Sequence, residues 1–202
     1  KRVGFAGTCS DETIRRNVRE GRVWCRVGPC GEYCENGFSG ERPQGPCYES
    51  ILFKEWWFCG GIFHSGPRAG QPMPIQHVEE GDIAVFTSRF PDEPREEQRR
   101  IVGLFLVGQV LEDEEGATYV EADSRLRIGL PMASARKLYF WDYYRNASGG
   151  PKWGSGLFRY LRNDQVARLL ADAHMVLPGE RDRSIAAEMY ETVFGGSIES
   201  AP

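Results

Sequence analysis

The sequence predicts an α+β fold in which a small mixed β-sheet curls into a partial barrel flanked by helices. One observation is the order of apolar patterns, which reads strand, helix, strand, helix, about four strands and then helix. A second is the length of 202 residues, enough for one ample domain with a real core. No apolar run reaches the roughly eighteen residues that a membrane-spanning helix requires.

The N-terminal part is predicted to form strands at residues 3–8 and 23–25, which are short and apolar. Ser10 is the expected N-cap of a helix between them, because a side-chain oxygen there accepts from an unpaired helical N–H. Residues 26–47 are rich in Gly, Pro and Cys, so we expect a loop or a small metal knuckle. Residues 48–63 are aromatic and apolar throughout, which favours a buried helix.

The central part carries the clearest strand patterns, at residues 83–87 and 101–110, joined by a charged hairpin loop at 90–97. Residues 118–121 and 138–144 are predicted to add two more strands. The sheet is therefore expected to be built mainly from this part of the chain.

Two amphipathic helices are predicted at the C-terminal end. Asn163 or Asp164 is expected to cap the first, and the second covers residues 184–194, stopped by glycine. We expect residues 1–178 to form one domain, with a Cys-rich insert at 26–47, and residues 179–202 to form a C-terminal helix and linker.

Charge is segregated along the chain. Residues 1–26 hold seven basic residues against three acidic ones, and residues 124–168 hold nine against two. Residues 79–115 hold eleven acids against four arginines. Arginine makes up 21 of the 25 basic residues, and its planar group binds phosphate bidentately and stacks on bases. The two basic stretches are therefore candidate nucleic-acid surfaces, although a GC-rich genome also explains the preference for arginine.

The opening motif reads Gly-Thr-Cys-Ser-Asp-Glu-Thr-Ile-Arg-Arg-Asn-Val over residues 7–18 and closes in Arg-Val-Trp-Cys over 22–25. It resembles the opening of YTH domains, where a strand ends in a polar loop, a short helix follows and the next strand begins with tryptophan. Residues 81–86 and 101–105 resemble the paired strands of the related EVE and PUA-like domains. Lys152-Trp153-Gly154 is similar to the loop that carries the second cage tryptophan of YTH domains.

This resemblance implies a module that reads a modified base. YTH domains bind N6-methyladenine in a tryptophan cage, and EVE-like relatives are often fused to nucleases that cut modified DNA. Extruding a base costs a few kcal/mol, which stacking on an aromatic wall can return at about 1–3 kcal/mol per base. We therefore expect recognition of methylated cytosine or adenine, in DNA more than RNA, by the specificity domain of a modification-dependent restriction endonuclease.

The resemblance also implies some of the site residues, and the residue pattern adds others. Trp24 and Trp153 are the expected pocket walls and Trp141 a third candidate, with core packing as the alternative for Trp24 and Trp141. Four polar-loop residues are expected at the base edge, of which Ser10 and Asp11 are equally explained as helix caps; they are Cys9, Ser10, Asp11 and Thr13. The basic stretches supply the candidate phosphate contacts, for each of which an ordinary solvated side chain is the alternative; they are Arg15, Arg19, Lys152, Arg159 and Arg162.

No cofactor is expected to be required. Four cysteines offer soft ligands for a structural zinc ion, although their gaps are not the two-residue spacing of strong zinc motifs and reduced thiols are the alternative; they are Cys25, Cys30, Cys34 and Cys47.

We find no phosphate-binding glycine loop, nucleophile elbow or nuclease motif, so catalysis by this chain is not expected. A cytoplasmic protein with no membrane partner is the expectation. A PUA-like enzyme acting on nucleotides or nucleic acid, and a zinc-stabilised protein-interaction module, remain open as alternatives.

Overall fold

The structure is a computed structural model with an α+β fold. It describes residues 9–20, 25–26, 29–43, 55–61, 63, 66–90, 93, 95–146, 149–153 and 158–201. The chain divides into two compact units, Lys1–Phe58 and Cys59–Pro202. Within the described ranges, no helix has both the length and the apolar character needed to cross a membrane.

Helix α1 (Asp11–Arg19) begins where the sequence predicts it, in the first unit. The Ser10 side chain accepts a hydrogen bond from the backbone N–H of Thr13 at 3.2 Å, so the predicted N-cap is confirmed. Ile14 is buried on the same helix. The predicted strand at residues 3–8 lies outside the described residues.

Helix α3 (Pro29–Glu35) replaces much of the loop expected at 26–47. Proline is favoured in the first turn of a helix because its missing N–H would be unpaired there in any case. A Cβ on Gly31 would lie 2.1 Å from the carbonyl oxygen of Arg26, so only glycine allows this close approach. Cys25 lies in a helical turn rather than in the predicted strand.

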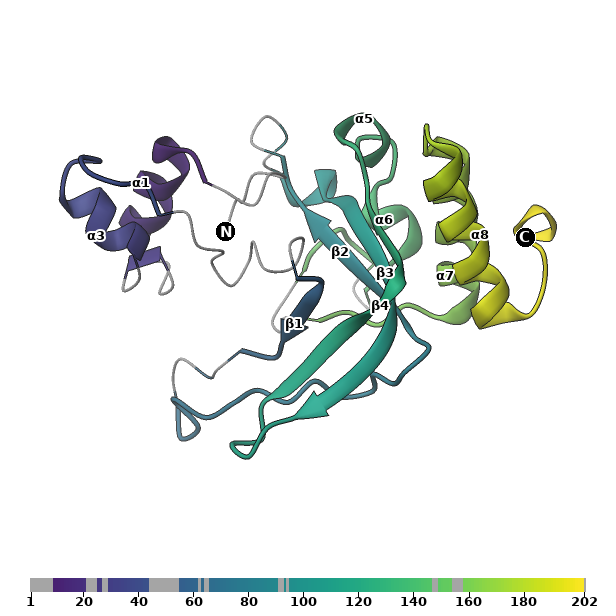
Figure 1. The fold of residues 1–202 in the computed structure, drawn as a ribbon, viewed down its shortest axis with the longest axis horizontal. Coiled ribbons are helices and arrows are strands. Elements are labelled where there is room, and N and C mark those ends of the chain that lie inside the picture. The colour runs from purple at the N-terminus through teal and green to yellow at the C-terminus, as the bar shows by residue number, and fades with distance from the viewer. Residues whose placement is uncertain are drawn as a thin grey trace. The chain divides into compact units, whose positions relative to one another are not determined.

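One curled sheet dominates the second unit, in the strand order β1-β4-β3-β2 (Figure 1). β2 pairs antiparallel with β3, and β3 with β4, through ladders with register shifts that bend the strands. The predicted strands at 83–87 and 101–110 are confirmed, whereas the one at 118–121 continues much further than predicted. The strands are β1 (Trp57–Cys59), β2 (Ile83–Ser88), β3 (Arg100–Glu112) and β4 (Thr118–Gly129).

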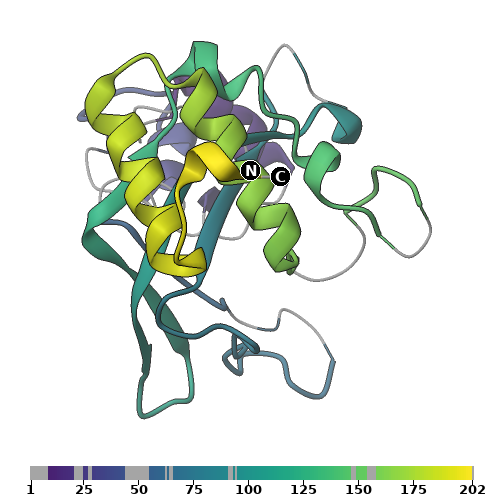
Figure 2. The same ribbon diagram turned by 90° about the vertical axis from the view of Figure 1, so that its right-hand side faces the viewer.

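Helices cover part of this sheet and bury its core. α7 (Asn163–Val176) packs on α8 (Glu180–Phe194), and α8 also packs on β4 (Figure 2). Strands β3 and β4 and helices α7 and α8 supply fully buried side chains to this core. They include Leu104, Phe105, Ile128, Leu169, Leu170 and Met189. The short helices are α5 (Met132–Ala135), α6 (Phe140–Tyr143), η1 (Glu96–Gln98) and η2 (Ile198–Ser200).

The two C-terminal helices confirm the predicted pattern with shifted starts. Arg162, not Asn163 or Asp164, occupies the N-cap position of α7, and its backbone N–H donates to the Gln165 side chain at 2.8 Å. α8 begins four residues before the predicted 184 and ends at Gly195, which adopts φ 72° as the left-handed cap.

Two predictions for aromatic stretches were wrong. Residues 48–63 are expected to form a helix, but the part that the structure describes is not helical. Trp56 has φ 56°, and strand β1 begins at the next residue. Residues 138–144, expected as a strand, make one bridge at Tyr139 and then form α6. Phe140 at the start of α6 stacks on Tyr144, the extended residue just after its end, with ring centroids 5.5 Å apart and an interplanar angle of 19°. A short helix with packed aromatic rings therefore takes the place of the predicted strand.

Candidate nucleic-acid interface

Trp153 is the centre of an aromatic and arginine-rich cluster in the second unit. The guanidinium carbon of Arg99 lies 4.3 Å from the centroid of its ring, and that of Arg159 lies 4.9 Å away. Phe140 contacts the same indole at a centroid distance of 5.3 Å. Trp153 is half-buried. Because a cation over an aromatic face is attracted by the ring quadrupole, these contacts hold the indole in place.

Arg99 is fixed by hydrogen bonds from three of its nitrogens. Nε and Nη2 donate to the two carboxylate oxygens of Glu96, at 2.5 and 2.9 Å. Nη1 donates to Oγ1 of Thr87 at 3.1 Å. Only 15% of the Arg99 side chain is exposed. Arg99 therefore supports the Trp153 ring from within the fold.

Trp141 belongs to α6 and is tied to the same segment as Arg99. Its indole Nε1 donates to the backbone carbonyl of Glu96 at 2.6 Å, and its ring contacts Phe140 and Tyr144. The structure thus joins Trp141 and Trp153 through Phe140, and the indole N–H of Trp141 serves a structural contact.

The candidate phosphate contacts of the second unit differ in availability. Lys152 and Arg162 are exposed, and Arg159 is half-buried with Nη1 donating to the carbonyl of Phe158 at 2.5 Å. Arg162 donates to both carboxylate oxygens of Asp164, at 3.0 and 2.8 Å, and this pairing lowers the pKa of Asp164. An exposed pair of this kind contributes little, so Arg162 can exchange Asp164 for a phosphate.

The polar loop before α1 is held by local bonds in the first unit. Besides capping the helix, Ser10 donates from Oγ to Oγ1 of Thr13 at 3.0 Å. Arg42 donates to Oδ1 of Asp11 at 2.5 Å and to the carbonyl of Cys9 at 3.3 Å. These contacts give the four polar-loop residues structural roles in α1 and in the segment just before it. Contact with a base edge stays a prediction for each of them.

The remaining candidates of the first unit are arginines and cysteines. Arg15 and Arg19 are exposed on α1, and the Arg15 guanidinium lies 4.6 Å from the ring centroid of Phe38. Cys30 and Cys34 lie one turn apart on α3. Within the described part of the chain, no three His, Cys, Asp or Glu side chains are grouped to hold a metal ion. Trp24 and Cys47 fall outside that part, so the expected cage of Trp24 and Trp153 stays a prediction.

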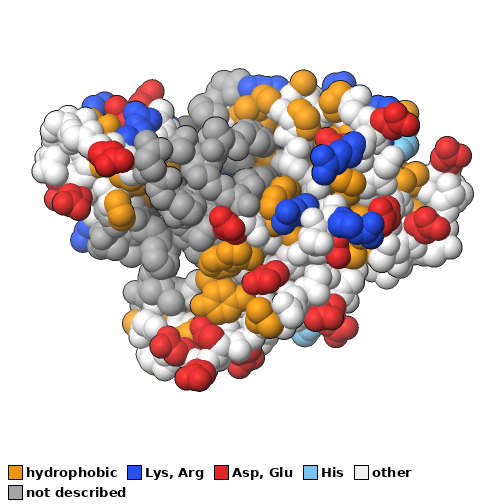
Figure 3. Space-filling view, in the orientation of Figure 1, with side chains coloured by type: hydrophobic (Ala, Val, Ile, Leu, Met, Phe, Trp, Pro, Cys, Tyr) orange, Lys and Arg blue, Asp and Glu red, His pale blue; other side chains and the backbone are white. Residues whose placement is uncertain are grey.

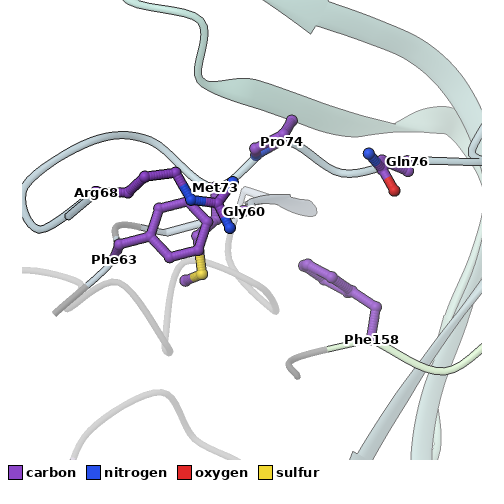
Figure 4. A pocket seen from close by; sticks show the side chains of 7 residues that line it. All are labelled: Gly60, Phe63, Arg68, Met73, Pro74, Gln76 and Phe158. Carbon is purple, nitrogen blue, oxygen red and sulfur yellow. The ribbon is translucent and has the colours of Figure 1, made fainter. Parts of the chain in front are cut away.

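A cavity of about 240 Å³ lies in the second unit, and the sequence analysis did not identify it (Figure 4). Most of its wall comes from residues 60–76, and one aromatic, Phe158, comes from far along the chain. No spacing in the sequence marks this set, because the fold alone brings its two parts together. The described residues that line the cavity are Gly60, Phe63, Arg68, Met73, Pro74, Gln76 and Phe158.

In contrast to the arginine-rich surface near Trp153, acidic side chains gather around the turn between β3 and β4 (Figure 3). There the Asp113 carboxylate accepts from the backbone N–H of Ala117 at 2.8 Å and from the hydroxyl of Tyr119 at 3.0 Å. These bonds stabilise the charged form and lower the pKa of Asp113. Phosphate binding is disfavoured at this turn.

Comparisons with known proteins do not identify a family: no protein-family model, no curated protein and no solved structure matches this chain.

Proposed function

We propose that this chain is a nucleic-acid-binding module that recognises an extruded modified base, methylated cytosine or adenine, and binds DNA in preference to RNA. The observation that carries the proposal is the contact of Trp153 with the guanidinium groups of Arg99 and Arg159. Indole rings stack on bases, and arginine binds both phosphates and base faces. The aromatic and cationic groups that single-strand contacts use are thus gathered around one loop.

The neighbouring charges are consistent with a backbone contact. Lys152 precedes Trp153, and the exposed Arg162 lies shortly after Arg159 at the start of α7. Lysine and arginine contacts to phosphate position a nucleic acid without reading its sequence. Discrimination must then come from the base itself, whose methyl group contributes roughly 0.8 kcal/mol when buried.

The sequence motifs supply the biological setting of the proposal. The likeness to YTH and EVE-like domains suggests the specificity domain of a modification-dependent restriction endonuclease in the cytoplasm, with the nuclease on another domain. In that arrangement this chain binds and a partner domain cleaves.

A binding panel tests the proposal. Short DNA and RNA, single-stranded and duplex, would carry N6-methyladenine, 5-methylcytosine or the unmodified base at one position, with affinity measured at fixed salt. We expect at least about fourfold tighter binding to one modified form, the factor that burial of one methyl group gives. A salt series separates the phosphate contribution, because counterion release makes log K fall linearly with log salt concentration. Equal, salt-sensitive binding to every oligonucleotide, or no binding, would contradict base recognition.

A further inference from the structure

The cavity of the second unit has the size of a small ring system. Its volume of about 240 Å³ is below the roughly 300–1,000 Å³ of sites for drug-sized ligands. A single planar heterocycle is the kind of group that it can accommodate.

The walls of the cavity favour an aromatic occupant. Figure 4 shows Phe158 on one side and Phe63 with Met73 on the other. All three side chains are half-buried. Aromatic faces and a polarizable thioether both interact favourably with a flat ring. The apolar part of the site is therefore suited to stacking.

Arg68 and Gln76 place hydrogen-bonding groups at the two ends of the cavity. Its guanidinium carbon lies 3.9 Å from the ring centroid of Phe63, and its side chain is exposed. Among the described residues, no carboxylate forms an ion pair with Arg68. The amide of Gln76, a donor and an acceptor, lies at the other end of the cavity (Figure 4). An occupant with hydrogen-bonding edges can thus be bound at two points.

Two consecutive residues connect this cavity with the Trp153 cluster. Phe158 lines the cavity, and Arg159 lies over the ring of Trp153. The next residue, Tyr160, donates from its hydroxyl to the backbone carbonyl of Gln76 at 2.5 Å and so fastens this segment to the cavity rim. A ligand in the cavity therefore lies next to the cationic surface that would hold a nucleic-acid backbone.

We propose that this cavity holds the extruded base, with its ring between Phe63 and Phe158 and its polar edge at Arg68 and Gln76. The inference rests on the proposed function, because it names the pocket in which the recognised base would lie. It differs from the cage of Trp24 and Trp153 expected from the sequence. In this arrangement Trp153 and Arg159 contact the flanking strand.

The test replaces the aromatic walls without removing their apolar bulk. Phe63→Leu and Phe158→Leu would be compared with wild type on short DNA duplexes carrying N6-methyladenine, 5-methylcytosine or the unmodified base. We expect each variant to bind the preferred modified duplex about fivefold more weakly or worse, as loss of one stacking contact implies. Its preference over the unmodified duplex should fall towards one. Leu111→Ala, which trims an exposed apolar side chain at the far end of β3, is the control.

Arg68→Gln is the second variant, because its side chain is exposed and its loss leaves the core intact. We expect roughly tenfold weaker binding to the same modified duplex, the effect of one charged hydrogen bond. Arg181→Gln, at an exposed residue of α8 outside both basic stretches, is the charge-matched control and should bind as wild type does.

The outcomes separate the two proposals. If wild type discriminates and all three cavity variants retain its discrimination with unchanged melting temperature, the base lies elsewhere and the inference is wrong while the function stands. If a leucine variant does not fold, Arg68→Gln decides alone. If wild type itself prefers no modified duplex, the proposed function fails, and the inference fails with it.

Discussion

Arg100 donates two hydrogen bonds to the carboxylate of Glu93, from Nε at 3.0 Å and from Nη2 at 2.9 Å, with only 3% of the arginine side chain exposed. Its Nη1 donates to the backbone carbonyl of Arg136 at 2.6 Å, and its guanidinium lies 3.3 Å from the ring centroid of Tyr139. Because Arg100 is the first residue of β3, this buried charge fastens the start of the strand to the segment between α5 and α6. A bidentate pair of this geometry is the strong form of a charged hydrogen bond.

Glu93→Ala should lower the free energy of unfolding by about 3 kcal/mol, because it leaves the buried charge of Arg100 without its carboxylate. Urea unfolding at neutral pH measures this change. Glu97→Ala is the control, since Glu97 pairs with Arg95 where both side chains are largely exposed, and about 0.5 kcal/mol is expected there. Equal costs for the two variants would contradict a structural role for the buried pair.

Trp153→Ala should weaken binding to any oligonucleotide that wild type binds by about 5- to 150-fold, the range for loss of one stacking platform. Trp153→Phe should recover part of the affinity. The measurement is fluorescence anisotropy of a labelled oligonucleotide at fixed salt. Tyr119→Ala, at the start of β4 beside the acidic turn, should leave affinity unchanged. If Trp153→Ala binds as wild type does, the cluster is only a packing contact.

Two variants of Ser10 distinguish its role as the N-cap of α1 from the predicted contact with a base edge. Ser10→Ala removes the side-chain acceptor for Thr13 N–H and should destabilise the first unit by about 1 kcal/mol. Ser10→Asp retains an N-cap acceptor and should preserve stability, which thermal unfolding followed by circular dichroism would report. If Ser10 also contacts a base edge, both variants lose affinity for the oligonucleotide. If only Ser10→Ala loses affinity for the oligonucleotide, the role of Ser10 is to cap α1.

Tyr143 predicts a dependence of stability on alkaline pH. Burial raises the pKa of its phenol well above the ordinary value, and the hydrogen bond to Oδ2 of Asp172, 2.7 Å long, raises it further. The folded protein therefore keeps the proton that the unfolded chain loses near pH 10. The stabilising contribution is complete below about pH 10 and is lost progressively as the pH rises beyond that value.

Tyr143→Phe should remove this part of the pH dependence. The free energy of unfolding of wild type should fall more steeply above about pH 10 than that of the variant. At neutral pH the variant should be less stable by about 1 kcal/mol, the net contribution of one hydrogen bond. Parallel curves for the two proteins across this range would show that Tyr143 ionises equally in both states.

Features that depend on neighbouring residues could be predicted from the sequence. The Ser10 cap requires only that its oxygen reach an N–H three residues on, and the end of α8 requires a left-handed residue, which Gly195 supplies. The strands at 83–87 and 101–110 follow from continuous apolar runs bounded by polar segments. The α+β class follows from the order of such elements, and the structure confirms it.

The candidate site depended on tertiary structure. Residues 138–144 are predicted as a strand, but they contain the short helix α6, in which Trp141 Nε1 donates to the backbone carbonyl of Glu96. Phe158 meets the rest of the cavity wall only when the chain folds back on itself. Local patterns are set by a few consecutive side chains, whereas a pocket is made by surfaces from distant segments that share no periodicity. The sequence by itself therefore determined the elements and the residue chemistry, and only packing decided which side chains share a site.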